Sequence, residues 1–326
     1  MKKIQEKLAC THPNVRHYGK RRRQCVVCKQ TWRVWKCKRG RKKVRVSINE
    51  AIAFIEHYTK PIRKGSHTRN HAQHHLAASR RLLVKTLPFP EVQDGEALIL
   101  IADAFVRHYE GVWHTWYVML VRTQTSDQAV ILPPYHRRGT ETVAGWDEAF
   151  MHMPQSVTNR VVALVCDGHN GLVLGAKRRS WLIQRCHFHL LAALQRHRSR
   201  WIKGRNKLEA TSLYRAVHTV LECTNEEELR EALGEIRLLK DATKSRIVRL
   251  TLSGFLTNYR DYRTYLTTPS LNLPTTSNTA ETLVGLIQEL ARRARGFRTV
   301  ATFHEWIVAL VKVRRFIHCR GKRQPN

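Results

Sequence analysis

The chain has 326 residues, and its 58 Lys and Arg against 25 Asp and Glu give a formal charge of +33 at pH 7. This length predicts two or three domains, because one small core cannot organise so long a chain. The positive charge is spread along the whole sequence and predicts a polyanionic partner. No apolar run approaches the ~18 residues that span a bilayer, and no apolar segment follows the Lys-rich N-terminus as in a signal peptide. We therefore expect a cytoplasmic protein that does not contact a membrane.

Residues 1–45 are expected to form a first, basic domain with 17 Lys or Arg and a single acidic residue, Glu6. The chain has eight cysteines, of which four lie in the first 37 positions. This usage favours metal ligation over a secreted disulfide framework. Cys25 and Cys28 form a Cys-x-x-Cys turn, which presents two ligands to tetrahedral zinc. A segment so short and charged would need the metal in order to fold.

Cys10 and His12 are the other two ligands that we predict for one structural Zn2+ in a zinc ribbon. A single residue separates them, so this half of the site is irregular, and His17 or Cys37 is an alternative fourth ligand. The alternative to a zinc site is a set of reduced cysteines in a basic loop. We expect the ribbon to bind DNA, with contacts from Arg21, Arg22 and Arg23.

Residues 46–90 are expected to form a helical segment. Ser47-Ile-Asn-Glu50 is a capping box and predicts the start of an amphipathic helix. A later helix, from about residue 79 to 87, carries Arg80 and Arg81. The segment is either a helix-turn-helix that places these two arginines on DNA, or a helical linker with a solvated basic face.

A main α/β domain is expected beyond residue 95. Its expected strands are 98–103, 112–122, 129–132 and 161–166, with a helix at 140–151. Three strands in a meander, a crossover helix and a parallel fourth strand form the core order of a ribonuclease H-like sheet. In that order the first and fourth strands are neighbours, so Asp103 and Asp167 lie at the same edge of the sheet. A carboxylate at the end of a buried strand needs compensation, usually from a divalent metal.

Three blocks after the fourth strand carry a resemblance to a known family. They read Asp167-Gly168-His169-Asn170-Gly171-Leu172, Gln184-Arg185-Cys186-His187-Phe188-His189 and Thr276-Ser277-Asn278-Thr279-Ala280-Glu281, with a basic cluster from Arg292 to Arg298. The blocks resemble the catalytic core of DDE transposases of the Mutator-like group, which a set of bacterial insertion-sequence transposases shares. The resemblance covers residues 95–315, and an N-terminal zinc ribbon is a common companion of this core.

The resemblance implies a catalytic domain that is divided along the chain. The ribonuclease H-like core would begin at 95–205 and end at 269–318, where helices carry the third carboxylate. An all-helical insertion would occupy 206–268. We expect the residues of the two core segments to form one site.

Asp103, Asp167 and Glu281 are the predicted metal ligands. The rivals of Glu281 for the third position are Glu289, Asp147 and Glu148. Strand cleavage and transfer need an activated water or 3'-hydroxyl and a stabilised leaving oxygen, and two Mg2+ or Mn2+ ions about 4 Å apart supply both. Three carboxylates suffice to hold them, because magnesium keeps several waters and binds phosphate oxygens.

Cys186 and His189 form a Cys-x-x-His pair, which places both side chains on one helical face and suggests a second zinc site. No partner pair follows at ligand spacing, unless His187 or His197 contributes. In the family that the chain resembles, this pair lies near the active site. We therefore assign it a supporting role, with His189 as the catalytic member and Cys186 as a core residue.

The basic cluster that follows Glu281 is expected to bind phosphates beside the metals. Its predicted DNA contacts are Arg292, Arg293, Arg295 and Arg298. The alternative for such dense charge is a solvated face. Phe303, Trp306 and Ile307 are expected to pack the final helix onto the sheet.

These features together predict a DNA transposase that binds the terminal inverted repeats of its insertion sequence, cleaves DNA and joins 3' ends to target DNA. Synapsis of two ends requires at least a homodimer, and a DNA partner places the protein at the nucleoid. Two alternatives keep the fold. One is a structure-selective nuclease or resolvase with the same two-metal site, and the other is a catalytically silent DNA-binding regulator.

Overall fold

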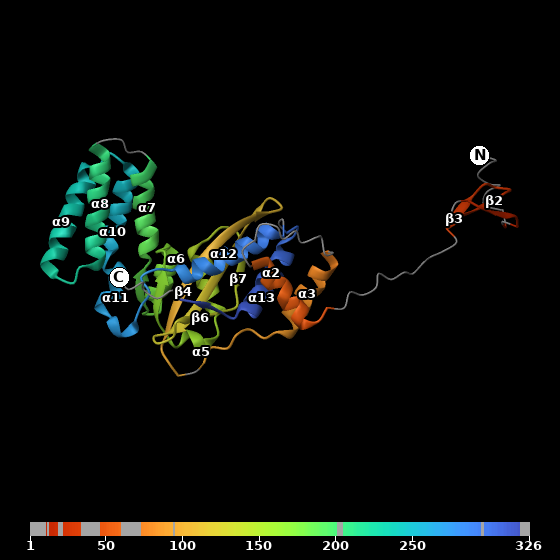
Figure 1. Ribbon diagram of the computed structural model, residues 1–326, viewed down its shortest axis with the longest axis horizontal. Coiled ribbons are helices and arrows are strands. Elements are labelled where there is room, and N and C mark those ends of the chain that lie inside the picture. The colour runs from red at the N-terminus through yellow and green to blue at the C-terminus, as the bar shows by residue number, and fades with distance from the viewer. Residues whose placement is uncertain are drawn as a thin grey trace. The chain divides into compact units, whose positions relative to one another are not determined.

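The computed structural model describes residues 11, 13–18, 22–33, 46–59, 73–93, 95–200, 205–294 and 297–319. The chain divides into two compact units, Met1–Arg45 and Val46–Asn326 (Figure 1). The first unit contains a small antiparallel sheet in the order β1-β2-β3. Its strands are β1 (Val15–His17), β2 (Arg22–Cys25) and β3 (Thr31–Arg33).

The second unit is a mixed α/β structure, as the sequence predicts. Its strands are β4 (Leu98–Tyr109), β5 (Val112–Thr123), β6 (Gln128–Ile131), β7 (Tyr135–Arg138), β8 (Val161–Cys166), β9 (Leu182–Arg185) and β10 (Phe316–His318). The helices that lie on the two sides of its sheet are α2 (Ile48–Thr59), α3 (Gln73–Thr86), α4 (Val143–Met151), α5 (Gln155–Thr158), α6 (Asn170–Arg178), α12 (Asn278–Arg293) and α13 (Val300–Arg314).

The central sheet has the strand order β10-β6-β5-β4-β8-β9. β7 pairs with the first half of β5, from His114 to Tyr117. β4 is antiparallel to β5 and parallel to β8. The predicted meander, crossover helix and neighbouring first and fourth strands are therefore confirmed, and β9 extends the sheet beyond β8. β7 and β10 were not predicted from the sequence.

β4 is longer than predicted, and this corrects the position of Asp103. We expected the strand to end at this residue, but β4 continues to Tyr109 because β5 pairs with it along its whole length. The hairpin turn has positive φ at both Glu110 and Gly111, the geometry of a type I′ turn that matches the twist of the strands. β8 pairs with β4 only as far as Ile101. Asp103 thus lies within β4, just beyond the end of the parallel pairing.

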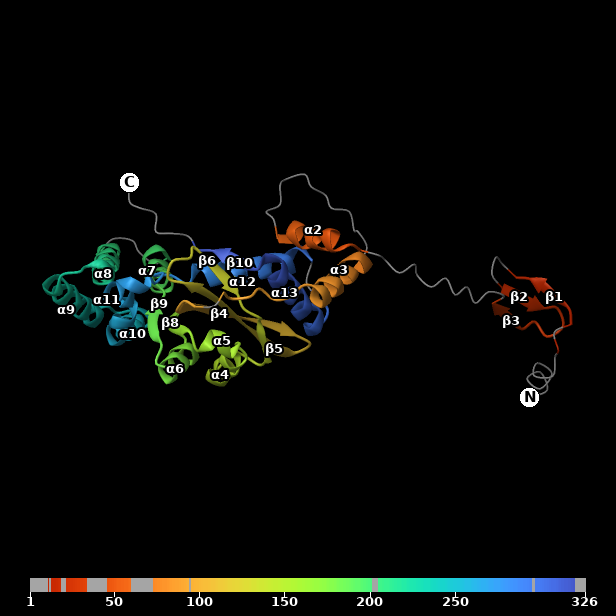
Figure 2. The same cartoon turned by 90° about the horizontal axis from the view of Figure 1, so that it is seen from below.

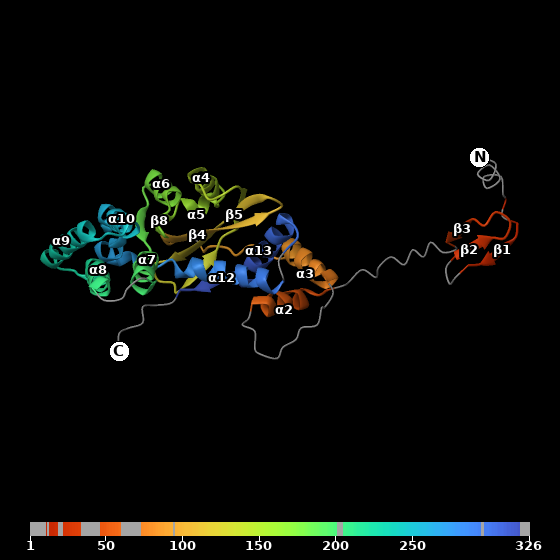
Figure 3. The ribbon, with the colours of Figure 1, turned by 90° about the horizontal axis from the view of Figure 1, so that it is seen from above.

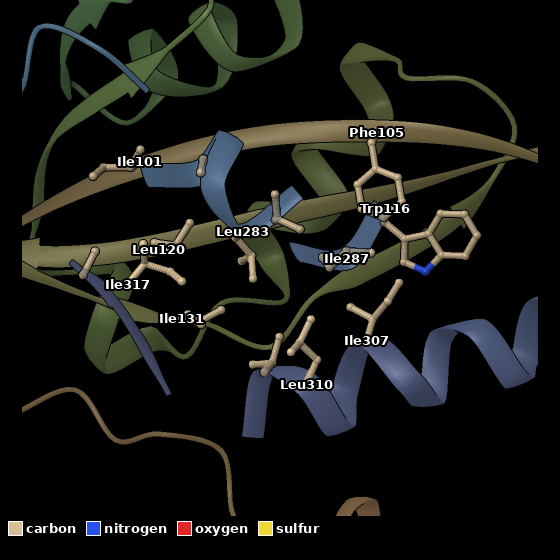
Figure 4. Close-up of a cluster of buried hydrophobic side chains, with 14 of the residues drawn as sticks. Ile101, Phe105, Trp116, Leu120, Ile131, Leu283, Ile287, Ile307, Leu310 and Ile317 are labelled. Carbon is tan, nitrogen blue, oxygen red and sulfur yellow. The ribbon is translucent and has the colours of Figure 1, made fainter. Parts of the chain in front are cut away.

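Helices cover both faces of the sheet. α2, α3, α12 and α13 lie on one side, and α4, α5 and α6 lie on the other (Figures 2 and 3). Because side chains alternate along a strand, Ile101 and Phe105 face the first group of helices, whereas Leu100 and Ala102 face the second. Figure 4 shows the first core, where Leu283 of α12 and Leu310 of α13 pack onto the sheet. Each such side chain contributes roughly 1.5–3 kcal/mol by its burial.

The described residues from 46 to 90 belong to the second unit, and their helices pack into its core. The capping box forms as predicted, since the Ser47 N–H donates to Glu50 Oε2 at 2.8 Å and the Glu50 N–H donates to Ser47 Oγ at 3.2 Å. Ile55 of α2 and Leu83 of α3 are nevertheless buried against α12 and α13. The apolar faces of the two helices are therefore used for packing within the unit.

A helical subdomain follows β9, in agreement with the prediction of an all-helical insertion (Figure 1). Its helices are α7 (His187–Arg200), α8 (Arg205–Glu222), α9 (Glu226–Ala242), α10 (Arg246–Tyr262) and α11 (Thr264–Thr267), followed by a 3-10 turn at Pro269–Leu271. It has a core of its own, in which Val217, Ile236 and Leu252 are fully buried. In the part of the chain that the structure describes, no helix has both the length and the apolar character that crossing a membrane requires.

Candidate metal centre

Asp103 and Asp167 lie next to each other at one edge of the sheet, as predicted. Ile101 pairs with Val165, so continuing the parallel register by two residues brings Asp103 level with Asp167, the first residue after β8. Both aspartates share the strand face of Ile101 and Val165, which point toward α12. Asp103 thus interrupts the apolar row on the α12 side of β4.

A glycine turn holds Asp167 after β8. Gly168 has φ +95°, a backbone conformation that favours glycine, and a Cβ there would lie 2.8 Å from Nη1 of Arg185 and displace that guanidinium. The N–H of His169 donates to Asp167 Oδ1 at 2.8 Å. His169 in turn caps α6, because its Nδ1 accepts from the Gly171 N–H at 3.1 Å. The turn therefore fixes the carboxylate with local hydrogen bonds.

Glu281 reaches this edge of the sheet from the first turn of α12. Its Oε1 lies 3.6 Å from His189 Nδ1 on α7 and accepts from Ser277 Oγ at 3.3 Å. Its charge acts on both Asp103 and His189. The structure thus brings together Asp103, Asp167, Glu281 and His189. Asp147 and Glu148, two of its rivals, lie instead on α4, where they pair with Arg178 and Arg137.

The pKa of Asp103 is raised from 3.8 to about 7. Burial is the largest cause, and the neighbouring charges of Asp167 and Glu281 raise it further. The Ala104 N–H, which donates to Oδ1 at 2.8 Å, and the charge of His189 act in the opposite direction. The balance leaves this carboxyl group only partly ionised at neutral pH. A buried carboxyl group with a raised pKa beside other carboxylates is typical of a functional site, and a bound cation would favour its ionised form.

Cys186 and His189 lie beside Glu281 at the start of α7. Burial raises the pKa of the Cys186 thiol, but hydrogen bonds with His189 and Ser277 outweigh it, and the net pKa is lowered. The pKa of His189 is raised to about 9, first by its hydrogen bond with Cys186 and then by the negative charges of Cys186, Glu281 and Asp167, against burial. The interaction between the two groups thus lowers the pKa of the thiol and raises the pKa of the imidazole.

Ser277 contacts both Cys186 and Glu281 and so links the thiol to the carboxylate. No role for this serine was predicted from the sequence. Its N–H donates to Cys186 Sγ at 3.3 Å, and its Oγ donates to Glu281 Oε1 at 3.3 Å. The residue is 1% exposed and occupies the N-cap position of α12. A serine four residues before a candidate carboxylate at a helix start is the signal that could have indicated this contact.

Among the described residues, one group of three potential ligands has its ligand atoms within 4.8 Å of one another, namely Cys186, His189 and Glu281. Asp103 and Asp167 are not part of this compact group. Asp103, Asp167 and Glu281 therefore do not meet this distance limit as a group of three.

The Gln184-Arg185 pair attaches the helical subdomain to the sheet edge. The side chain of Gln184 is fully buried, and it donates to the carbonyl of Tyr262 at 2.9 Å and accepts from the Tyr265 N–H at 2.9 Å. Arg185 pairs with Asp261 at 3.3 Å. These contacts give the second sequence block a positioning role that its residue types alone did not indicate.

The predicted DNA-binding arginines divide into two classes, which corrects part of the prediction. Arg22, Arg23, Arg81, Arg292 and Arg298 are exposed. Arg80 is buried and its Nε lies 2.6 Å from Glu305 Oε2, while Arg293 pairs with Glu289 at 2.5 Å and donates to the carbonyl of His57 at 2.7 Å. Arg80 and Arg293 are thus used within the fold. Arg21 and Arg295 lie outside the described residues.

Cys25 and Cys28 lie in a tight turn of the first unit. The Lys29 N–H donates to the carbonyl of Cys25 at 3.0 Å, and Lys29 has φ +62°. His17, the alternative ligand, is exposed at the end of β1. The other predicted ligands, Cys10 and His12, and the alternative Cys37 lie outside the described residues.

Comparisons of the sequence with protein-family models and with curated proteins found no match.

Proposed function

We propose that the chain is a DNA transposase of the DDE type with a ribonuclease H-like core. The observation that carries the proposal is the convergence of Asp103, Asp167 and Glu281 at the edge where β8 stops pairing with β4. The carboxylates come from two neighbouring strands and from a helix that follows a helical subdomain. This combination supports the resemblance carried by the sequence blocks.

Two Mg2+ or Mn2+ ions are the cofactors that fit these side chains. The donors are carboxylate oxygens, which hard divalent cations prefer, and burial together with the charges of Asp167 and Glu281 raises the pKa of Asp103 to about 7. A bound cation would favour the ionised form of this group. When bound, such ions activate a water or 3'-hydroxyl and stabilise the leaving oxygen of the phosphodiester. Asp103, Asp167 and Glu281 would hold them.

His189 has a positioning role in this proposal. Its Nδ1 lies 3.6 Å from Glu281 Oε1, and its raised pKa keeps the ring cationic at neutral pH. A cation at this distance orients the carboxylate and offsets part of the charge on Asp103. Ser277 supports the same carboxylate from the helix N-cap.

DNA is the partner that the charge favours. The exposed Arg81, Arg292 and Arg298 belong to the catalytic unit, and the exposed Arg22 and Arg23 belong to the first unit, where Zn2+ on Cys25 and Cys28 would stabilise the ribbon. We infer that the first unit binds the terminal inverted repeats, that at least two copies assemble on the two ends, and that the protein acts at the nucleoid.

Cleavage of DNA that carries the ends of the element tests the proposal. Asp167→Asn and Glu281→Gln should each reduce Mg2+-dependent cleavage by about 10³-fold or more, the effect of losing several kcal/mol of metal-derived stabilisation, while DNA binding is retained. Asp147→Asn is the matched control, because this carboxylate pairs with Arg178 on the other side of the sheet. Unchanged cleavage in Asp167→Asn and Glu281→Gln would contradict the assignment.

Joining of a cleaved 3' end to a second DNA distinguishes a transposase from a nuclease that uses the same site. We expect joined products with the wild-type chain and Mg2+. Cleavage without joining, on ends that the protein binds, would favour a nuclease or resolvase. Binding without cleavage would favour a silent regulator.

A further inference from the structure

We propose that Cys186, His189 and Glu281 form a binding site for Zn2+, and that zinc at this site inhibits catalysis by withdrawing Glu281 from the magnesium centre. The metal site stands on the geometry of these three residues alone. The inhibitory effect rests on the proposed function.

The distances favour a compact tetrahedral site. Zn–S lengths of about 2.3 Å and Zn–N or Zn–O lengths of about 2.0–2.1 Å place the ligand atoms of a tetrahedral site roughly 3.3–3.6 Å apart. His189 Nδ1 and Glu281 Oε1 are already 3.6 Å apart, and the three ligand atoms all lie within 4.8 Å of one another. Binding therefore requires small side-chain adjustments and no change in the backbone.

The donor set selects against magnesium. Thiolate sulfur and imidazole nitrogen favour zinc and other soft or borderline cations, whereas Mg2+ requires oxygen ligands in octahedral geometry. Cys186 is fully buried, while His189 and Glu281 are each partly exposed. Three protein ligands from a buried thiol and two accessible side chains leave a fourth position open to water, as in three-ligand zinc sites.

The fold holds the three ligands at the junction of β9 with α7 and on α12. Cys186 directly follows β9, and its N–H donates to the carbonyl of Cys166 at 2.7 Å, so the sheet fixes its backbone. His189 follows one turn later on α7. Glu281 comes from α12, and Ser277 at the start of that helix donates to both the thiol and the carboxylate. The ligand group is thus arranged before any metal binds, which reduces the cost of binding.

Sharing of Glu281 links the two sites. A carboxylate bound to zinc beside Cys186 is displaced from Asp103 and Asp167, which are not part of the compact group. The site would hold two carboxylates instead of three for the catalytic ions. Zinc is therefore expected to compete with Mg2+ through one shared ligand.

A cobalt titration of the full-length, reduced chain tests the metal site directly. Co2+ replaces Zn2+ and gives a thiolate-to-cobalt absorption band. The first unit contributes the same band to every variant, so the difference between wild type and Cys186→Ser isolates the proposed site. We expect Cys186→Ser to lose about one equivalent of thiolate-bound cobalt. Cys223→Ser, which removes a buried thiol of the helical subdomain, should lose none.

A second pair of variants avoids changes to the buried thiol. Glu281→Gln should weaken cobalt binding by at least about tenfold, since loss of even an outer partner of a metal ligand costs about 10–100-fold. Asp103→Asn should leave the cobalt affinity unchanged, because Asp103 is outside the ligand group. Equal cobalt spectra in wild type and Cys186→Ser, or equal affinities in Glu281→Gln and Asp103→Asn, would overturn the site.

Inhibition is measured as the cleavage rate in Mg2+ plus Zn2+ relative to each variant's own rate in Mg2+ alone. Wild type should be inhibited, and Cys186→Ser should need at least tenfold more Zn2+. Equal sensitivity of the two proteins would overturn the inhibitory role. Absence of Mg2+-dependent cleavage in every sample would contradict the proposed function and the inhibitory role, while the cobalt spectra would still decide the metal site.

Discussion

Two groups of charged side chains lie on the same side of the central sheet, and they differ in how their charge is balanced. Arg80 and Arg293 each contact a carboxylate of the protein, Glu305 at 2.6 Å and Glu289 at 2.5 Å. At the other group, Asp103 lies beside Asp167 and Glu281, and burial with these like charges raises its pKa to about 7.

The comparison shows how a strongly basic chain separates structural charge from functional charge. A largely buried cation that is paired within the protein stabilises the packed state, and removal of one partner is costly. A group of carboxylates without sufficient compensation destabilises the protein unless a ligand supplies positive charge. The balanced arginines are therefore expected to affect stability, and the carboxylates to affect ligand binding.

The largest expected loss of stability comes from substitution of Arg80 on α3. Arg80→Ala should lower the free energy of unfolding by about 2 kcal/mol, because it removes the packing of a buried side chain and its ion pair with the partly exposed Glu305. Urea unfolding followed by circular dichroism measures the change. Arg81→Ala, the exposed neighbour, is the control and should stay within about 0.5 kcal/mol of wild type. Equal effects of the two substitutions would contradict the structural assignment of Arg80.

The second prediction concerns the pH dependence that Asp103 causes. Its pKa is raised from 3.8 to about 7, so between these values the folded chain holds a proton that the unfolded chain has released. The free energy of unfolding contributed by this group therefore falls as the pH rises from about 4 to 7 and stays low above it. Asp103→Asn removes this fall and, without divalent metal, should be about 1–2 kcal/mol more stable than wild type at pH 7.5.

Addition of Mg2+ should make wild type more stable than Asp103→Asn, the reverse of their order without metal. At a concentration of 100 times its dissociation constant, a ligand that binds only the folded state adds about 2.7 kcal/mol. Wild type should gain such stability at pH 7.5, and Asp103→Asn should gain much less. A stabilised Asp103→Asn protein that responds to Mg2+ as fully as wild type would exclude Asp103 as a ligand.

The third prediction separates two adjacent arginines that share one partner. Arg292 and Arg293 both contact Glu289, but the side chain of Arg292 is 65% exposed and that of Arg293 is 9% exposed. Arg293→Ala should cost about 1 kcal/mol, since it also leaves the carbonyl of His57 without this donor. Arg292→Ala should leave the unfolding curve unchanged. A stability loss in Arg292→Ala equal to that in Arg293→Ala would show that exposure does not decide the effect.

Much of the sheet could be predicted, because runs of apolar residues mark its longer strands. The order of the first four strands follows from a meander and a crossover helix, and it implies that Asp103 and Asp167 are neighbours. β7 and β10 could not be predicted, since Tyr135–Arg138 has no apolar alternation and Phe316–His318 is three residues long. The full length of β4 depends on its pairing with β5. The sequence Glu110-Gly111 indicates a turn but not how far the two strands pair before it.

The candidate site was harder to predict wherever it depends on contacts between distant elements. Burial of Arg80 requires Glu305 of α13, and nothing in the sequence around α3 indicates that partner. The proximity of Glu281 to Cys186 depends on how the helical subdomain returns the chain to the sheet edge. Local spacing therefore suggested candidate ligands but not which of them share one space.

The last and smallest effect tests which face of the catalytic unit binds DNA. Each cation that contacts a phosphate contributes about one to the slope of log affinity against log salt. Arg298→Gln and Arg81→Gln, which change exposed residues of the α12 side, should each reduce that slope by about one, for every DNA sequence alike. Arg178→Gln changes a cation that is 58% exposed on α6, on the opposite side of the sheet, and should leave the slope unchanged. An equal reduction by Arg178→Gln would mean that DNA contact is not confined to the face that carries the carboxylates.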